Sequence, residues 1–198
     1  MQFHFLARIL LDMRFAVVDI ETTGGFPQQH GITEIAIVLM DGGTIEGQYS
    51  TLINPHQIIP PFIANMTGIS DAMVADAPSF KTVAKNIYTL LHDRVFIAHN
   101  VNFDYSFVKY HLETAGYNLQ APKVCTIRTS RKVFPGLKKY GLGYLTRELG
   151  IKIEGRHRAG GDALATAQIM QLILQKNGLP IIKDMLKKEA LLKEQNGE

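Results

Sequence analysis

The sequence has a single cysteine, Cys125, and no tryptophan. One cysteine cannot form a disulfide within the chain, which suits the reducing environment of the cytoplasm. No apolar run reaches the roughly 20 residues that a membrane-spanning helix needs, and the short apolar segment near the N-terminus lacks a secretory cleavage site. We therefore expect neither a disulfide-stapled secreted protein nor a membrane protein, and we predict a cytoplasmic location.

The sequence also lacks repeats, low-complexity segments and Pro/Gly-rich linkers. Its 198 residues, 46% hydrophobic and 20% charged, are enough for one domain with a sizeable core. We predict a main domain over residues 13–178, an N-terminal extension over 1–12 and a C-terminal helical tail over 179–198. A short amphipathic tail of this kind either packs on the domain or docks a partner.

Acidic residues are scarce in one segment. Residues 121–160 contain ten Lys/Arg and only two Asp/Glu, although the whole chain has a net charge of only +3. The rest of the chain is therefore acidic. A basic segment beside an acidic remainder fits a polyanion partner such as nucleic acid, and it equally fits a solvated surface with uneven charge.

Hydrophobic periodicity predicts the order of the elements. Three strand-like runs come first, RFAVVDI, GITEIAIVLMD and GTIEGQYSTLINP, and Asp41-Gly42-Gly43 between the last two is typical of a hairpin. A short helix is expected near 62–66, and helical patterns alternate with short strands thereafter. This order predicts an α/β fold with a mixed β-sheet flanked by helices on both faces.

Two acids end the first strand. Asp19 and Glu21 are two residues apart, so both side chains leave the strand on the same side. Like charges this close raise each other's pKa unless a cation lies between them. Solvent at the strand end, a shared proton or a hard metal ion would each account for the pair.

Two more acids open helices, Asp104 after VFIAHN and Asp162 before ALATAQIMQLIL. Each could simply stabilise a helix N-terminus, typically by ~0.3–1 kcal/mol. Strand ends and helix starts can meet at one edge of a mixed sheet, and four carboxylates without a thiolate favour Mg²⁺ or Mn²⁺ over zinc. His157 precedes Asp162 on a glycine-rich basic loop, where it is either a surface group or a base near that site.

The motifs DIETTG, AHNVNFD and HRAGGD together resemble those of the DEDDh family of 3′–5′ exonucleases, which includes the epsilon subunit of DNA polymerase III, ribonuclease T and oligoribonuclease. The resemblance spans roughly residues 15–175 and implies a ribonuclease H-like fold. It implies two divalent cations, Mg²⁺ or Mn²⁺, held by four carboxylates, and His157 as the base that deprotonates the attacking water. The implied metal ligands are Asp19, Glu21, Asp104 and Asp162.

The resemblance also implies contacts with the substrate. The residues concerned are Thr22, Thr23, Met66, His99, Asn100 and Phe103. Met66 could instead be an ordinary core residue, and His99 a structural histidine. Cys125-Thr126 stands where many members of the family have Asp-Thr, which leaves the subfamily open.

The resulting functional hypothesis is a metal-dependent 3′–5′ exonuclease of the DNA polymerase III epsilon type. It would act on single-stranded or frayed DNA 3′ ends, in proofreading or repair, and release nucleoside 5′-monophosphates. An exoribonuclease of the ribonuclease T or oligoribonuclease type is one alternative. A non-catalytic module that binds nucleic acid or docks on a polymerase subunit is another.

Overall fold

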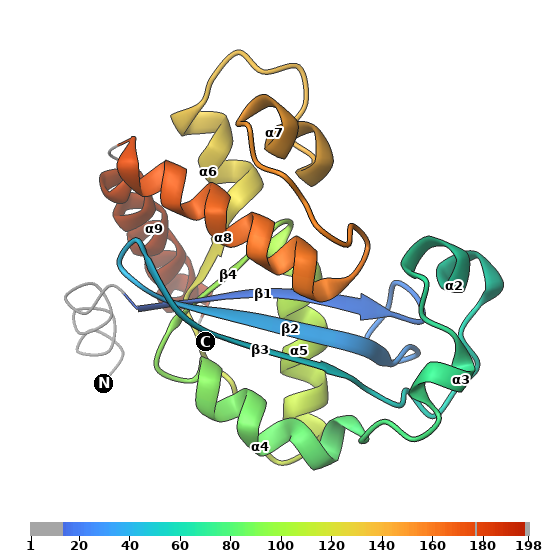
Figure 1. Cartoon of the computed structure of the whole chain (residues 1–198). Coiled ribbons are helices and arrows are strands. Elements are labelled where there is room, and N and C mark those ends of the chain that lie inside the picture. Colours follow the sequence, from blue (N-terminus) through green and yellow to red (C-terminus); the bar gives the residue numbers. More distant parts are fainter. Residues whose placement is uncertain (1–13, 177, 197–198) are drawn as a thin grey trace.

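The computed structural model describes residues 14–176 and 178–196 and is built around a five-stranded mixed sheet (Figure 1). The strand order is β3-β2-β1-β4-β5, with β1–β2 and β2–β3 antiparallel and β1–β4 and β4–β5 parallel. The strands are β1 (Arg14–Thr22), β2 (Ile32–Asp41), β3 (Thr44–Leu52), β4 (Val95–Ala98) and β5 (Lys123–Cys125). The predicted mixed sheet and its first hairpin are therefore confirmed.

Side-chain alternation along β1 assigns its residues to two cores. Ala16, Val18 and Ile20 pack in the core on one face of the sheet, and Phe15 and Val17 pack in the core on the other. Since side chains two residues apart in a strand share a face, Asp19 and Glu21 lie on the same face of the sheet as Phe15 and Val17. The two acids at the end of β1 therefore face the helices of that core.

Helices cover both faces of the sheet, as predicted (Figure 1). The first core is closed by α4 (Phe80–Leu91) and α5 (Val101–Thr114), and Ser79 caps α4 by accepting the Thr82 N–H at 3.3 Å. The second core is closed mainly by α8 (Ala159–Gln175), which contacts both β1 and β2, and by α7 (Leu142–Glu148). This arrangement brings the N-terminus of α8 over the far end of β1.

Two short helices form a lobe beyond the end of the sheet, α2 (Pro61–Thr67) and α3 (Asp71–Val74) (Figure 1). The helix expected near 62–66 is α2, whereas α3 and α6 (Thr126–Val133) lack any long periodic signal and were not expected. Four residues of α3 are too few to display a period, which explains that omission.

The C-terminal helix α9 (Leu179–Asn196) packs on the domain through Ile182 and Leu186, which are buried in the second core. The predicted extension over residues 1–12 lies outside the described residues. Among the described helices, none combines the length and the apolar character that crossing a membrane would require.

Candidate active site

Three carboxylates meet where the end of β1 faces the start of α8. One oxygen each of Asp19, Glu21 and Asp162 can be chosen so that all three lie within 4.8 Å of one another. The strand supplies two of them through its two-residue period, and α8 supplies the third from its first turn. The tertiary structure thus unites acids that lie more than 140 positions apart in the sequence.

This cluster is electrostatically costly without a cation. Burial raises the pKa of Asp19 well above its ordinary value, and the charges of Asp104, Asp162, Glu21 and Glu34 raise it further. Burial, followed by Asp162 and Glu34, raises the pKa of Glu21 to about 8. Like charges in a poorly hydrated site favour protonation unless a positive charge is supplied.

Asp104 lies beside the cluster and is separate from its central group of three. Its side chain is only 4% exposed, and burial raises its pKa to about 8, although backbone N–H groups of Asp104 and Ile20 favour the ionised form. It projects from the first turn of α5 and is close enough to raise the pKa of Asp19. Its predicted role at a second metal ion stays a prediction.

The donor set fits a hard divalent cation. The Oδ1 atom of Asp162 is buried and has no hydrogen-bond partner among the described residues. An unpaired buried carboxylate oxygen beside two more carboxylates offers the all-oxygen environment that Mg²⁺ and Mn²⁺ prefer. Asp19, Glu21 and Asp162 are therefore the residues that could hold such an ion.

His157 is held close to this group by a strained loop. Its backbone has a φ of 61°, in the left-handed region, and its N–H donates to Oδ2 of Asp162 at 3.2 Å. A non-glycine residue in such a conformation costs ~1–3 kcal/mol and persists only where surrounding contacts enforce it. Gly161 is one such constraint, because a Cβ there would collide with the backbone oxygen of Glu154.

A fifth acid, Glu34 on β2, was missed by sequence analysis. It lies directly opposite Glu21 in the β1–β2 ladder and is 4% exposed. Its carboxylate accepts hydrogen bonds from Arg158 at 2.7 and 3.0 Å and from the Ala159 N–H at 2.8 Å. The available signal was a single acid within the apolar run ITEIAIVLM.

The two threonines after the β1 acids take part in local structure. The Thr22 hydroxyl donates to the Gly24 carbonyl at 2.7 Å. The buried Thr23 hydroxyl donates to Oε1 of Gln57 at 2.8 Å and accepts the Gly31 N–H at 3.0 Å. Both residues border the cluster, and their contact with a terminal nucleotide stays a prediction.

The other predicted substrate contacts lie in two places. Met66, on α2, is 51% exposed, so its alternative interpretation as a core residue is wrong. Near the start of α5, Asn100 is exposed and Phe103 packs against Phe107 with ring centroids 5.1 Å apart. His99 bonds to Oγ1 of Thr126 at 2.9 Å through Nδ1, and burial lowers its pKa to about 4, which matches a neutral, structurally bonded histidine.

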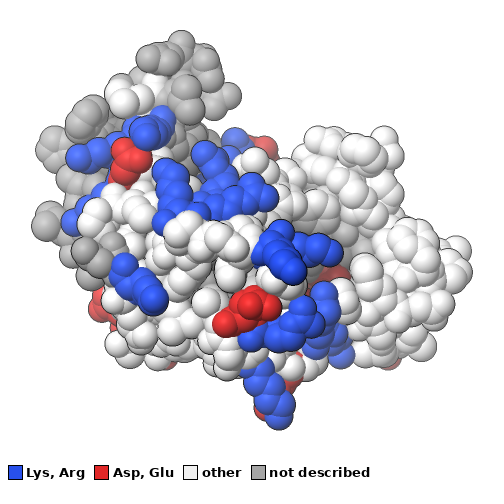
Figure 2. Space-filling model, turned by 90° about the horizontal axis from the view of Figure 1, so that it is seen from above, with Lys and Arg blue, Asp and Glu red and all other residues white. Residues whose placement is uncertain are grey.

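The walls around the cluster differ in charge. Residues 53–79, which include the α2–α3 lobe, contain no Lys or Arg, whereas residues 121–160 are strongly basic. In Figure 2, Lys and Arg side chains gather over the face built by α6, α7 and α8, and the lobe on the right carries none. The exposed side chains of the lobe include Phe62 and Met66.

The chain was compared with known proteins. A family model described as "Exonuclease" (RNase_T) matches residues 16–170. The chain is 37% identical over 168 residues to the DNA polymerase III subunit epsilon of Aquifex aeolicus (strain VF5), covering 84% of this chain and 83% of that one. It is 43% identical over 165 residues to the "3′-5′ exonuclease DinG" of Bacillus subtilis (strain 168), covering 82% of this chain and 18% of the relative.

Solved structures agree with these matches. A structure of "Exonuclease X in complex with 5′ overhanging duplex DNA" superimposes with a TM-score of 0.70 at 26% identity, covering 87% of this chain and 98% of that one. Escherichia coli exonuclease I with a dT13 oligonucleotide shares the fold, with a TM-score of 0.74 at 19% identity over 86% of this chain and 42% of that one. The chain spans less than a fifth of the DinG protein and most of the epsilon subunit. With the acidic cluster, its strained histidine loop and these matches in agreement, the chain belongs to the exonuclease family.

Proposed function

We propose that the chain is a 3′–5′ exonuclease that removes nucleotides from single-stranded or frayed DNA, using two divalent cations, Mg²⁺ or Mn²⁺. The observation that carries this proposal is the cluster of Asp19, Glu21 and Asp162, with oxygens within 4.8 Å of one another and His157 bonded to it through its backbone. Relatives named as DNA polymerase III and exonuclease proteins support DNA as the substrate.

In the proposed reaction, water attacks the phosphorus of the last phosphodiester and the bond to the 3′ oxygen of the preceding nucleotide breaks. His157 accepts the proton of the attacking water, because imidazole exchanges protons near neutral pH. Asp19, Glu21 and Asp162 would hold one cation, and Asp19 and Asp104 a second. When bound, such cations make water more acidic and stabilise the attacking and leaving oxygens. A nucleoside 5′-monophosphate leaves, and the shortened strand keeps a 3′ hydroxyl.

The walls around the cluster suit a single strand. Lys and Arg on one side attract the phosphate backbone, and exposed apolar side chains on the lobe offer surfaces for bases. Thr22, Thr23 and Met66 would contact the last nucleotides. His99, Asn100 and Phe103 would shape the pocket behind them. A DNA polymerase subunit is a further proposed partner, supported by the name of the epsilon relative.

A degradation ladder tests the proposal. DNA and RNA of one sequence, labelled at the 5′ end, are incubated with the protein in Mg²⁺, Mn²⁺ or EDTA. We expect stepwise shortening from the 3′ end that EDTA abolishes and that is faster on DNA. Faster cleavage of RNA would reassign the substrate to the ribonuclease T type. Intact substrate in both metals, from a folded protein, would contradict the proposal and favour a binding module.

A further inference from the structure

We propose that a basic pocket beside the catalytic loop binds a backbone phosphate of the nucleic acid at a nucleotide other than the one being removed. The pocket, of about 410 Å³, lies between α7 and the segment that leads into the catalytic loop. It is formed by Gly143, Thr146, Arg147, Gly150, Ile151, Lys152, Ile153 and Arg156. The inference rests on the proposed nuclease function and assigns a second substrate contact.

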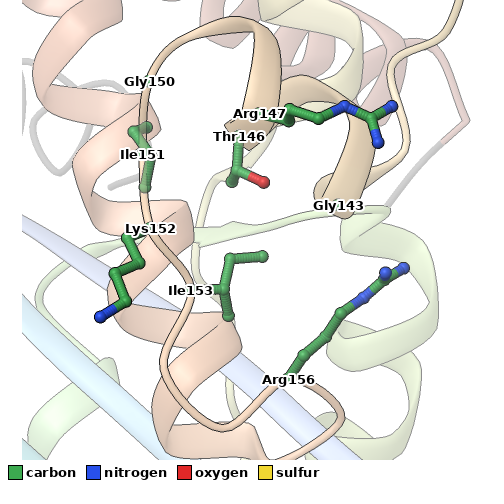
Figure 3. Close-up of a pocket in the computed structure, with 8 residues that line it drawn as sticks. All are labelled: Gly143, Thr146, Arg147, Gly150, Ile151, Lys152, Ile153 and Arg156. Atoms are coloured by element: carbon green, nitrogen blue, oxygen red, sulfur yellow. The ribbon is translucent and has the colours of Figure 1, made fainter.

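Two arginines from different segments converge on this pocket. Arg147 extends from α7 and Arg156 from the loop, and Figure 3 shows both reaching towards the side of Gly143. Lys152 extends the other way, and its Nζ lies 3.7 Å from a carboxylate oxygen of Glu154. Within residues 14–176, no carboxylate oxygen lies within 4.0 Å of the side-chain nitrogens of Arg147 or Arg156. The Arg147 guanidinium lies over the ring of Tyr144, 5.2 Å from its centroid, which leaves the N–H groups of both arginines available for an external anion.

Gly143 makes room for this arrangement. Glycine inside a helix costs roughly 0.5–1 kcal/mol relative to alanine, yet α7 has one at its second residue. A Cβ at Gly143 would lie 2.6 Å from Cζ of the Arg156 guanidinium. The missing side chain therefore allows the guanidinium of Arg156 to lie against α7, close to the helix that carries Arg147.

The remaining lining favours a phosphodiester over a small free anion. Ile151 and Ile153 are half-buried and form an apolar part of the wall. Both arginines are exposed, so the pocket is open to a long polymer. Guanidinium groups bind the paired oxygens of phosphates through two parallel hydrogen bonds.

One residue of the pocket adjoins the candidate active site in the sequence. Arg156 immediately precedes His157 in the sequence. Figure 2 shows that Lys and Arg side chains are spread over this whole face of the molecule. A strand held at the metal ligands would therefore meet the pocket with a neighbouring phosphate, either its own or that of a paired strand.

Binding measured without hydrolysis tests the pocket. Fluorescence anisotropy in EDTA gives the Kd of a labelled dT20 strand for the wild type, Arg147→Ala, Gly143→Ala and Lys85→Ala over a range of salt. Arg147→Ala removes one positive charge. Gly143→Ala keeps every charge but displaces the Arg156 side chain. We expect Arg147→Ala to raise Kd about tenfold at low salt. Gly143→Ala should raise it less, because the exposed Arg156 side chain can shift away from the new Cβ. We expect Arg147→Ala to lower the salt slope by about 0.7.

Lys85→Ala is the matched control, since it removes an exposed positive charge from α4 on the opposite face of the sheet. Circular dichroism confirms that each variant is folded. An Arg147→Ala protein with the wild-type Kd and salt slope on both dT20 and a duplex with a 3′ overhang would overturn the pocket assignment, even if the degradation ladder shows an active nuclease. Conversely, a pocket-dependent Kd without any hydrolysis in the ladder would refute the proposed function alone.

The same titration with a duplex that has a 3′ overhang identifies the source of the phosphate. A loss of affinity already present on dT20 places the phosphate in the strand being degraded. A loss confined to the duplex places it in the complementary strand. Both results support the phosphate site, and equal affinity of wild type and variants on both substrates overturns it.

Discussion

Arg158 binds Glu34 through two parallel hydrogen bonds of 2.7 and 3.0 Å, joining the N-cap of α8 to the start of β2. Glu34 also accepts the Ala159 N–H, so one buried carboxylate fixes the residues that directly follow His157. The positive charge of Arg158 also offsets part of the repulsion that raises the pKa of Glu21. We therefore expect Glu34 to act as a positioning residue for the loop that carries His157.

Substituting Glu34 should disturb the site without removing a predicted metal ligand. Glu34→Gln leaves Arg158 without its charged partner, and we expect kcat to fall by about 10- to 100-fold, as for other residues that orient metal ligands. Arg158→Lys keeps the charge but loses the two parallel bonds, so it should show a smaller loss in the same direction. Steady-state kinetics with an Mn²⁺ titration would measure both, and a wild-type kcat in Glu34→Gln would contradict the positioning role.

Removing a carboxylate from the cluster should separate activity from stability. Asp19→Asn is expected to abolish hydrolysis, because a predicted ligand of both cations loses its charge. Its Tm in EDTA should exceed that of the wild type, because the neutral asparagine is not repelled by the neighbouring carboxylates. Thermal melts with and without Mn²⁺ would test this, with the exposed Asp41→Asn as control. Full activity in Asp19→Asn would rule out the metal assignment.

The stability of the metal-free protein should depend on pH. The pKa of Glu21 is raised from 4.5 to about 8 in the folded chain, so between these values the native state binds more protons than the unfolded state. The free energy of unfolding should therefore fall as pH rises from 4.5 to 8. Urea melts in EDTA would show this slope, and saturating Mn²⁺ should flatten it. A stability that rises over this interval in EDTA would be the opposite of the expected sign.

His157 should affect chemistry more than metal binding. We expect His157→Ala to lower kcat by about 10²- to 10⁴-fold, the usual contribution of a general base. The Kd for Mn²⁺, measured by calorimetry, should stay within a few-fold of the wild type because the carboxylates remain. His92→Ala, at the end of α4, serves as the control histidine. An unchanged kcat in His157→Ala would remove this residue as the base.

The apolar side chains of α2 should contribute to substrate affinity. Phe62 is 70% exposed and lies four residues before Met66, so both occupy one side of the helix. Replacing both by alanine should raise the Kd for dT20 about tenfold, because base stacking contributes ~1–3 kcal/mol per base. The Tm should barely change, since neither side chain is buried. Leu191→Ala, an exposed apolar residue on α9, is the matched control, and the same small effect in both proteins would exclude stacking on α2.

The sequence predicted correctly those features that depend on one strand or one turn alone. The alternation along β1 predicted that Asp19 and Glu21 share a face, and Asp41-Gly42-Gly43 predicted the hairpin between β2 and β3. The short helices α3 and α6 were missed, α3 because four residues display little periodicity and α6 because the residues that it buries are Thr126, Thr129 and Ser130 rather than apolar side chains. Glu34 was also missed, because a single acid within an apolar run is equally expected in a strand that exposes one face to solvent.

By itself, the sequence determined most of the strand and helix order and the shared face of the two β1 acids, since these depend on periodicity, and its motifs resemble those of metal-dependent exonucleases. Only the tertiary structure decided which groups meet. It placed Asp162 against the β1 acids and paired Glu34 with Arg158. Such contacts join residues distant in sequence, and they depend on how α8 packs on the sheet.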